Sequence, residues 1–360
     1  MHTESNRTMK ALVYEGPNRI AWKDHPRPRL QEPTDAIVRI TATSICGTDL
    51  HILHGDVPAV DAGRVLGHEG VGIVEEVGAM VTDVHVGDRV VISVITSCGR
   101  CSACKRQMPS HCRHGGWLLG NSIDGTQAEF VRVPFADNGL HVLPPGVPDE
   151  SAVMLSCALP TGYECGVCSG NVQPGKSVAI IGAGPVGLAT LLAAQLFSPA
   201  EIFLVDHDDN RLETGRLLGA TQIVNNSKGD GAERIRAMTE GMGVDVAIEV
   251  VGLSETFDIC QSVVAAGGHL ANVGVHAGAV SLRLGQLWAA NVTLTTRLVD
   301  GTSTAMLLKL LENRKLAATE LISHRFAMPE ILVAYETFGR AAEHRTLKVV
   351  VRAGEEGDLV

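Results

Sequence analysis

The sequence lacks long apolar runs and lacks an apolar export signal. None of its uninterrupted apolar stretches approaches the roughly 18 residues that a membrane-spanning helix requires. The residues before Met9 are polar, without the apolar middle of a secretory signal. We therefore expect no membrane as a partner, and the missing signal predicts a cytoplasmic protein.

Positive charge is also scarce. The chain has 30 Lys and Arg against 40 Asp and Glu, a formal net charge of −10. This balance disfavours nucleic acid and anionic membrane surfaces as main partners. The chain is nevertheless 45% hydrophobic, so it can bury sizeable cores, and its 360 residues predict about two domains.

Short apolar segments bounded by turn residues predict a β-rich region at the start of the chain. From Pro174 onward, strands alternate with helical stretches, which indicates βαβ units and a parallel sheet. We therefore expect an α/β domain at residues 161–297, inserted into a β-rich domain formed by residues 1–160 and 298–360. The expected strands are Ala36–Ala42, Gly70–Val77, Arg89–Ile95, Ser177–Ile181, Ile202–Val205, Gln222–Val224, Val244–Val251, His269–Val275 and Thr346–Val351, and the expected helices are Val186–Leu196, Asn210–Leu218, Ala305–Glu312 and Ile331–Phe338.

Nine cysteines stand in this long chain, whereas disulfide scaffolds are usually short and secreted. Metal ligands, core residues or nucleophiles are therefore the expected roles. Thiolates at the spacing C-x2-C-x2-C-x7-C can close a tetrahedral zinc site without an open position, which would be structural. An iron–sulfur cluster or free buried thiols are the alternatives. The four cysteines are Cys98, Cys101, Cys104 and Cys112.

The segment 182–187 is a G-x-G-x-x-G turn between an expected strand and an expected helix, the context of a dinucleotide site. Gly182 permits the tight turn, Gly184 lets a pyrophosphate approach, and Gly187 lets helix and strand pack closely. Pro185 and Val186 open the helix, whose free N–H groups and positive dipole end would face the phosphates. The alternative is a plain glycine turn.

Asp206 ends the second strand of this unit, where its carboxylate can accept hydrogen bonds from ribose hydroxyls. It would repel a 2′-phosphate, as would Asp208 and Asp209, so NAD is favoured over NADP. Arg211 is the nearby cation that could oppose this preference. The alternative role for Asp206 is to start the following helix.

Cys46 and His68 are candidate catalytic metal ligands, since a thiolate with an imidazole suits zinc. A catalytic zinc needs three protein ligands and an open position, and Cys157 is the thiol available as the third. Taken singly, such a cysteine is more often a small buried hydrophobe, and such a histidine is more often a core residue.

The segment Gly67-His68-Glu69-x2-Gly72-x5-Gly78-x2-Val81 resembles, at every defined position, the zinc-binding motif of the medium-chain zinc-dependent alcohol dehydrogenase family. The segment 46–51, the four-cysteine segment and the glycine-rich turn are similar too, and follow in that family's order. The resemblance runs from about Met9 to the end of the chain. It implies a GroES-like β-rich catalytic domain with both zinc sites and a Rossmann NAD-binding domain.

The resemblance also implies residue roles. Cys46, His68 and Cys157 would hold the catalytic zinc, with Glu69 close to the metal and Asp49 orienting His68. A proton would leave the alcohol through the relay hydroxyl of Thr48 and then the cofactor ribose to the terminal base His51. Residues implied to lie near the cofactor are Thr161, Val273 and Val275, and those implied to make the substrate pocket apolar are Trp117, Leu119 and Leu298. Gly47 departs from the basic phosphate-binding residue of some members.

The expected protein is thus an enzyme that transfers a hydride between a small primary or secondary alcohol and NAD, giving an aldehyde or ketone, with one catalytic and one structural zinc per chain. A polyol, threonine or formaldehyde dehydrogenase of the same family, or a non-catalytic zinc-stabilised NAD sensor, is the alternative. Family members are dimers or tetramers; we expect a tetramer, with the strand His269–Val275 near the sheet edge extending the sheet between copies. The pair Cys165 and Cys168 is a C-x-x-C in the wrong context for a thioredoxin-like role.

Overall fold

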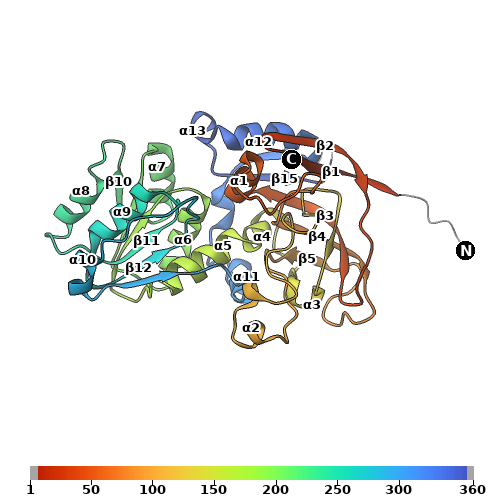
Figure 1. Ribbon diagram of the computed structural model, residues 1–360, viewed down its shortest axis with the longest axis horizontal. Helices are drawn as coiled ribbons and strands as arrows, with labels where there is room; N and C mark the ends of the chain where they lie inside the picture. Colours follow the sequence, from red (N-terminus) through yellow and green to blue (C-terminus); the bar gives the residue numbers. More distant parts are fainter. Residues whose placement is uncertain (1–6, 355–360) are drawn as a thin grey trace, which may run out of the picture. The chain divides into compact units, whose positions relative to one another are not determined.

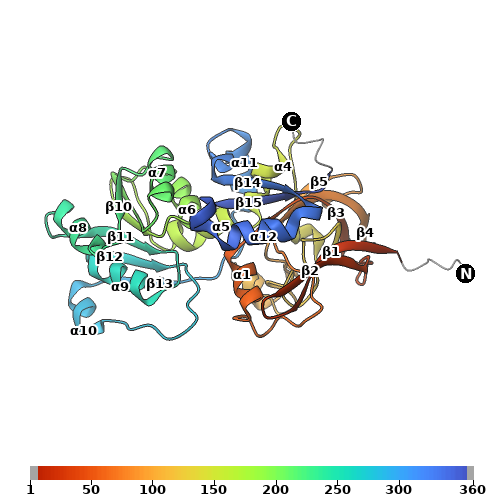
Figure 2. The same ribbon diagram turned by 90° about the horizontal axis from the view of Figure 1, so that it is seen from above.

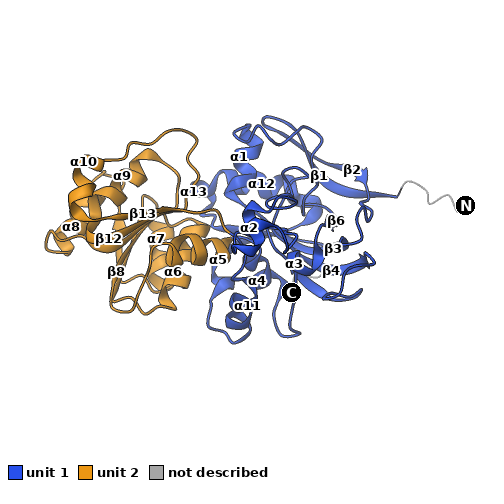
Figure 3. Ribbon diagram, turned by 60° about the horizontal axis from the view of Figure 1, so that its bottom comes forward, with its two compact units in different colours: residues 1–157, 300–360 blue, residues 158–299 orange. Residues whose placement is uncertain are grey.

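The computed structural model describes residues 7–354 and divides the chain into two compact units, coloured separately in Figure 3. Unit 1 consists of residues 1–157 and 300–360, and unit 2 of residues 158–299. We predicted domain boundaries after residues 160 and 297, and the two compact units divide after residues 157 and 299. Residues 1–6 of the polar segment before Met9 lie outside the described residues. Among residues 7–354, none of the helices is both long and apolar enough to cross a membrane.

A seven-stranded sheet is the frame of unit 1. Only β14 and β15 pair in parallel, and the other neighbours are antiparallel. In this sheet the last strand of the chain, β15, lies beside β3, a strand from its beginning (Figure 1). The spatial order is β14 (Ile322–Ala327), β15 (Lys348–Arg352), β3 (Ala36–Ile45), β4 (Gly70–Val77), β5 (Arg89–Ile92) and β7 (Leu140–Val142), with β6 (Phe130–Val133) also paired to β3; β1 (Thr8–Gly16) and β2 (Arg19–Pro26) form a separate hairpin.

The core of unit 1 lies against this sheet. Helix α12 (Ile331–Gly339) lies next to β15 (Figure 2) and buries Ile331, Ala334 and Phe338, which recur at the spacing of one helix face. The remaining helical segments of unit 1 are α1 (Gly47–His54), α2 (Ser102–Lys105), η1 (Pro109–His111), α3 (Ala136–Gly139), α4 (Asp149–Ala152), η2 (Val153–Leu155), α11 (Thr304–Glu312), η5 (Ala318–Leu321), η6 (Met328–Glu330) and α13 (Ala341–His344).

Unit 2 contains a six-stranded sheet in which every neighbouring pair is parallel. The chain starts in the middle at β8, builds outward to β10, and then crosses to the other side at β11. In such sheets ligands bind at the carboxyl ends of the strands where the winding direction reverses, here between β8 and β11. The spatial order is β10 (Gln222–Asn225), β9 (Glu201–Asp206), β8 (Ser177–Ile181), β11 (Val244–Glu249), β12 (Val264–Asn272) and β13 (Thr293–Thr296).

The strands β8, β9 and β11 are almost completely buried, which explains why they read as continuous apolar runs in the sequence. Their apolar side chains and those of α9 form one core. The helical segments of unit 2 are α5 (Ala158–Thr161), the π-helix η3 (Gly162–Cys168), α6 (Pro185–Gln195), α7 (Asp209–Leu217), α8 (Gly231–Met238), α9 (Ser254–Val263), α10 (Leu284–Leu287) and η4 (Trp288–Ala290).

Several of the expected strand bounds were wrong: the strand expected at Val244–Val251 ends at Glu249, and the one expected at His269–Val275 ends at Asn272. The strand expected at Arg89–Ile95 ends at Ile92, and the closing strand begins at Lys348. The strand expected at His269–Val275 is β12, which starts at Val264 and lies inside the sheet, because β13 occupies the edge. Strand β13 has the sequence TLTT, with a single large apolar residue, so it carries little of the apolar signal by which buried strands are recognised.

Candidate functional site

The first side chain of the site, Cys46, stands where β3 ends and α1 begins. Its backbone is extended, and its N–H donates to the Asp49 carboxylate at 2.9 Å, so the side chain at the third helical position fixes the helix start. Gly55 ends the same helix in the left-handed conformation. Because β3 is buried along nearly its whole length, Cys46 is carried on a rigid strand end.

His68 and Glu69 lie in the turn before β4, and the glycine before them is required there. Gly67 has φ +92°, and a Cβ on it would lie 2.6–2.8 Å from atoms of Gln127 and Thr126. Glu69 is held through its carbonyl oxygen, which accepts from the hydroxyls of Thr43 and Thr126. The glycine of the motif is therefore explained by close packing of the turn.

Cys157 joins these residues from a third segment. The preceding Ser156 accepts a hydrogen bond from the Gly70 N–H at 3.1 Å, which ties the segment to the turn that carries Glu69. In the cluster that results, each residue offers one ligand atom within 4.8 Å of the others: Cys46, His68, Glu69 and Cys157. His68 and Glu69 are buried, whereas Cys46 and Cys157 are residues of intermediate exposure.

The electrostatics of the cluster suit a cation. Hydrogen bonding to Cys157 lowers the pKa of Cys46 well below its usual value despite burial, and the same contact raises the pKa of Cys157. Burial alone would lower the pKa of His68, but the charges of Asp49 and Cys46 outweigh it and raise the pKa well above normal. Two sulfurs sharing a proton beside an imidazole form a donor set that suits zinc.

His68 is supported from behind by a chain of buried polar side chains. Its Nδ1 lies 3.5 Å from the Asp49 carboxylate, which accepts from the Gln127 amide at 3.2 Å. Gln127 in turn accepts from the Tyr335 hydroxyl at 2.7 Å, on helix α12. Partners of this kind orient a ligating imidazole and fix its tautomer. The sequence reasoning found Asp49 and missed Gln127 and Tyr335.

Glu69 is held by two groups that the sequence reasoning also missed. Its Oε2 accepts hydrogen bonds from the Ser44 hydroxyl on β3 and from the Lys348 ammonium on β15. The side chains of Lys348 and Glu69 are 2% and 1% exposed, so this is a fully buried ion pair. A lysine in the otherwise apolar closing strand was the available signal, since lysine is almost never buried unless it is paired.

The predicted relay residues lie on α1. Thr48 is partly buried, with Oγ1 3.8 Å from the Cys46 sulfur. His51 is exposed and its Nδ1 lies 3.1 Å from Asp56. Of the residues expected to line the substrate pocket in this unit, Trp117 makes an edge contact with the His68 ring, with centroids 6.0 Å apart. Leu119 is fully buried and belongs to the core, so it offers no surface to a substrate.

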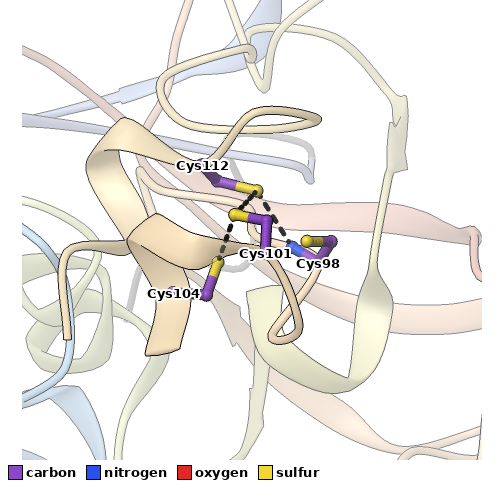
Figure 4. Close-up of side chains that lie close together, drawn as sticks. All are labelled: Cys98, Cys101, Cys104 and Cys112. Atoms are coloured by element: carbon purple, nitrogen blue, oxygen red, sulfur yellow. Dashed lines mark hydrogen bonds between the residues drawn. The ribbon is translucent and has the colours of Figure 1, made fainter. Parts of the chain in front are cut away.

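The four-cysteine segment forms a second cluster of unit 1, drawn in Figure 4. The sulfurs point toward one another, with Cys101 3.6 Å from Cys104 and 3.9 Å from Cys112. Backbone N–H groups of Cys98 and His114 donate to the Cys112 sulfur. These cysteines form no disulfide. Four sulfurs gathered by one loop leave no position for a substrate, which fits a structural metal.

The loop prepares these thiols for a cation. Hydrogen bonds from backbone N–H groups, chiefly that of Cys104, lower the pKa of Cys101 to about 5, whereas burial raises the pKa of Cys104 to about 12. A bound dication would remove this difference because coordination deprotonates thiols outright. The sulfur cluster fits zinc, and the same donors would suit the iron–sulfur alternative.

The glycine-rich turn of unit 2 has the backbone expected of a dinucleotide site. Gly182 has φ +115°, and a Cβ on Gly187 would lie 1.9 Å from the Gly182 carbonyl oxygen. A Cβ on Gly184, by contrast, would meet nothing nearer than the Arg211 guanidinium at 3.9 Å. Gly184 thus opens onto free space at the start of α6, where Pro185 and Val186 begin the helix. That space is where a pyrophosphate would fit.

Next to this turn lies a cavity of about 450 Å³, lined by Asp206, Arg211 and side chains from the ends of β8, β9 and β11. The Asp206 carboxylate accepts from the N–H groups of Ala183, His207 and Asp208 at 2.7–3.0 Å, so it is fixed in place. The Arg211 Nε is buried without a hydrogen-bond partner among the described residues. An anchored acceptor and an unpartnered donor facing one cavity fit a nucleotide.

The other predicted residues of unit 2 are more dispersed. Thr161 ends α5, and Val273 and Val275 follow β12, where Val275 is 73% exposed. Cys165 is buried and Cys168 is exposed on η3. Leu298 is half exposed near the end of the unit. The structure brings the metal ligands together in unit 1 and the residues of the glycine-rich turn, with Asp206 and Arg211, together in unit 2; the roles of these residues stay predictions.

Comparison with protein families matches two segments of the chain. Residues 32–145 match the alcohol dehydrogenase GroES-like domain, and residues 185–313 match the zinc-binding dehydrogenase family. The first match contains the Gly67–Glu69 turn and all four clustered cysteines, and the second contains Val186, Gly187 and Asp206.

Individual proteins are similar over most of the chain. The apo form of zinc-dependent alcohol dehydrogenase 2 from Streptococcus pneumonia is 49% identical, with a TM-score of 0.93, covering 97% of this chain and 99% of that one. An alcohol dehydrogenase of Cupriavidus necator is 34% identical over 96% of this chain and 98% of its own length. The NADP-dependent isopropanol dehydrogenase of Clostridium beijerinckii is 34% identical over 74% of this chain and 76% of its own length.

Proposed function

The chain belongs to the medium-chain zinc-dependent alcohol dehydrogenase family, and from this premise we propose that it transfers a hydride between a small primary or secondary alcohol and NAD. The product is an aldehyde or ketone. The observation that carries the proposal is the cluster of Cys46, His68 and Cys157, with ligand atoms within 4.8 Å of one another and with only three such ligands besides Glu69. A metal held there keeps a side open to substrate, unlike one enclosed by four sulfurs.

In the proposed mechanism, Cys46, His68 and Cys157 would hold a zinc ion, which would supply a Lewis acid for the substrate oxygen, and bound NAD would supply the hydride acceptor. Asp49 keeps the His68 imidazole in one orientation. The Thr48 hydroxyl, close to the Cys46 sulfur, would take the hydroxyl proton of the alcohol while it gives up its own proton toward His51. His51, one helical turn further and exposed, exchanges that proton with water.

Activity with a panel of substrates tests the proposal. Metal-counted protein would be mixed with NAD or NADP and with ethanol, 2-propanol, 1-hexanol, benzyl alcohol, a polyol or threonine, while the absorbance of reduced nicotinamide is followed. We expect turnover of simple alcohols with NAD, abolished by a chelator. Turnover of the polyol or threonine alone would favour those related enzymes. A single zinc per chain without any turnover would favour the non-catalytic sensor.

The preference for NAD over NADP is supported by the charges around the nucleotide cavity. Asp206 lines it, and Asp208 and Asp209 follow directly, whereas Arg211 is the arginine among its lining residues. A 2′-phosphate would meet the fixed Asp206 carboxylate. The similar isopropanol dehydrogenase of Clostridium beijerinckii uses NADP, which makes NADP the second candidate.

The variant Asp206→Asn should lower the ratio of kcat/KM for NAD to that for NADP about 10- to 100-fold, because like-charge repulsion of the 2′-phosphate is removed. The ratio is the useful quantity, since the lost hydrogen bond from the Ala183 N–H affects both cofactors. Asp209→Asn is the comparison: Asp209 carries a nearby charge without lining the cavity, so its removal should lower the ratio less than that of Asp206. An unchanged ratio in Asp206→Asn would remove this residue from cofactor selection.

We further propose that the protein is a homo-oligomer, with a tetramer preferred over a dimer, and that β13 replaces β12 as the strand that extends the sheet. Strand β13 ends the parallel sheet, so its outer backbone groups are unpaired within the sheet. Exposed apolar side chains occur on and around this edge: Leu284 is 61% exposed, Trp288 75% and Leu294 38%.

The double variant Trp288→Glu, Leu294→Glu should halve the particle mass measured by light scattering after size-exclusion chromatography, because charges would be buried at the edge. Leu217→Glu is the control, since Leu217 is 73% exposed on α7, next to β10 at the opposite edge. An unchanged mass in the double variant would contradict the assignment of this edge.

The cytoplasm stays the proposed compartment, where the unpaired cysteines would remain reduced.

A further inference from the structure

The buried pair formed by Lys348 and Glu69 has no part in the mechanism described so far. Lys348 begins β15 and reaches Glu69 from the sheet, while Ser44 reaches the same carboxylate oxygen from β3. The other oxygen, Oε1, is buried and has no hydrogen-bond partner among the described residues. Glu69 is therefore anchored by one oxygen, and the second is left without a partner beside the cluster of ligands.

A carboxylate in this place is a potential zinc ligand. Zinc binds Asp and Glu oxygens as well as cysteine and histidine, and Glu69 lies within the same 4.8 Å cluster as the three proposed ligands. If it bound, it would occupy the position that an alcohol needs. Something must therefore hold the carboxylate back, and the groups that contact it are Ser44 and Lys348.

A purely structural purpose is a poor explanation for this pair. Removing two charges from water costs several kcal/mol per ion in real proteins, and apolar replacements of buried ion pairs are often neutral or stabilising. The pair therefore places two polar side chains where the fold alone would gain more from two apolar side chains.

We propose that Lys348, assisted by Ser44, is a positioning residue that holds the Glu69 carboxylate beside the metal's open position without letting it fill that position. This inference rests on the proposed function, since it requires a metal at Cys46, His68 and Cys157. The positive charge of Lys348 also balances the negative charge of Glu69. The thiolates of Cys46 and Cys157 are then the groups whose negative charge balances that of a dication. The lysine of the closing strand thereby sets how easily an alcohol reaches the metal.

Cobalt(II) placed at the catalytic site, with zinc kept at the four-cysteine cluster, tests this without relying on turnover. The visible bands of cobalt report the number and type of its ligands, and its thiolate charge-transfer band reports Cys46 and Cys157. In Lys348→Met we expect the visible bands to shift or weaken as Glu69 binds the metal, and in Ser44→Ala a smaller shift in the same direction. In the double variant Lys348→Met, Glu69→Gln the wild-type bands should return.

With zinc bound, the KM of Lys348→Met for the alcohol should rise about 10- to 100-fold, the range usual for residues that support metal ligands.

Arg132→Met is the matched control, because it breaks another buried ion pair of unit 1, formed with Asp35 at 3.0 Å with side chains 14% and 1% exposed. It should lower stability and leave the cobalt bands unchanged. If Arg132→Met shifts the bands as Lys348→Met does, or if the shift persists in the double variant, the proposal is overturned.

Wild-type bands in both Lys348→Met and Ser44→Ala would also overturn it. If Lys348→Met does not fold, the cobalt bands of Ser44→Ala test the proposal, since that variant leaves the ion pair of Lys348 and Glu69 intact. Unshifted bands in Ser44→Ala would then overturn it. The absence of a thiolate charge-transfer band from the wild-type protein would instead mean that the proposed metal site itself is wrong. Failure of the proposed function and failure of the role of Lys348 therefore give different spectra.

Discussion

Cys157→Ser is expected to abolish alcohol oxidation and to remove one of the two expected zinc ions. Serine is a poor zinc ligand at neutral pH, and its hydroxyl cannot replace the sulfur that Cys157 offers within the 4.8 Å cluster. Loss of several kcal/mol of Lewis-acid stabilisation corresponds to a fall in kcat/KM of about 10³-fold or more. Metal content per chain and initial rates with NAD are the two measurements.

The four sulfurs from Cys98 to Cys112 form a separate cluster, so their zinc should stay bound in this variant. Unfolding temperature should therefore change little, whereas Cys104→Ser should lower it, because structural zinc contributes folding free energy. Cys168→Ser is the control for a general effect of losing a thiol, as Cys168 is exposed and outside both clusters. A Cys157→Ser protein that retains both zinc ions would exclude Cys157 from the ligand set.

Thr48→Ala should lower kcat about 10²- to 10⁴-fold, the range that a positioned proton-transfer group contributes. Thr48 is partly buried next to the Cys46 sulfur, where water cannot easily take its place. Thr48→Ser keeps the hydroxyl and should retain most of the activity. Zinc content should be unchanged in both variants, because threonine is not among the clustered ligands.

His51→Gln should cost much less, at most about tenfold, since an exposed terminal base can be replaced in part by solvent. The His51 side chain is 47% exposed and pairs with Asp56 at the surface. The comparison of steady-state kcat values between Thr48→Ala and His51→Gln is the measurement. Equal and negligible losses in the two variants would contradict the relay from Thr48 to His51.

Local patterns predicted much of the fold and the centre of the site. The glycine-rich turn, the four-cysteine segment and the Gly67–Glu69 turn each hold their chemistry within a few residues, so their spacing is visible in the sequence. Strands such as β8 and β9 were recognisable because they are buried on both faces and therefore apolar throughout.

The groups that support the metal ligands could not be predicted in this way. Lys348 lies 279 residues from Glu69, and Tyr335 lies 208 residues from Gln127, so only the sheet order brings them together. A buried lysine or glutamine carries no periodic signal, and its partner cannot be read from spacing. Leu119 was misplaced for a related reason: its position within the family suggested a pocket wall, whereas the packing of unit 1 encloses it completely.

The insertion of β15 between β14 and β3 also dictates an order of events during synthesis. The cysteines from Cys98 to Cys112 come from a single loop, so they can take up their metal soon after that loop leaves the ribosome. Cys46, His68 and Cys157 are all made before unit 2, yet the strand that completes their sheet and brings Lys348 to Glu69 is among the last segments translated. On the proposal that both clusters bind zinc, the nascent chain can hold the metal of the four-cysteine cluster before Lys348 reaches Glu69 and completes the surroundings of the proposed catalytic site.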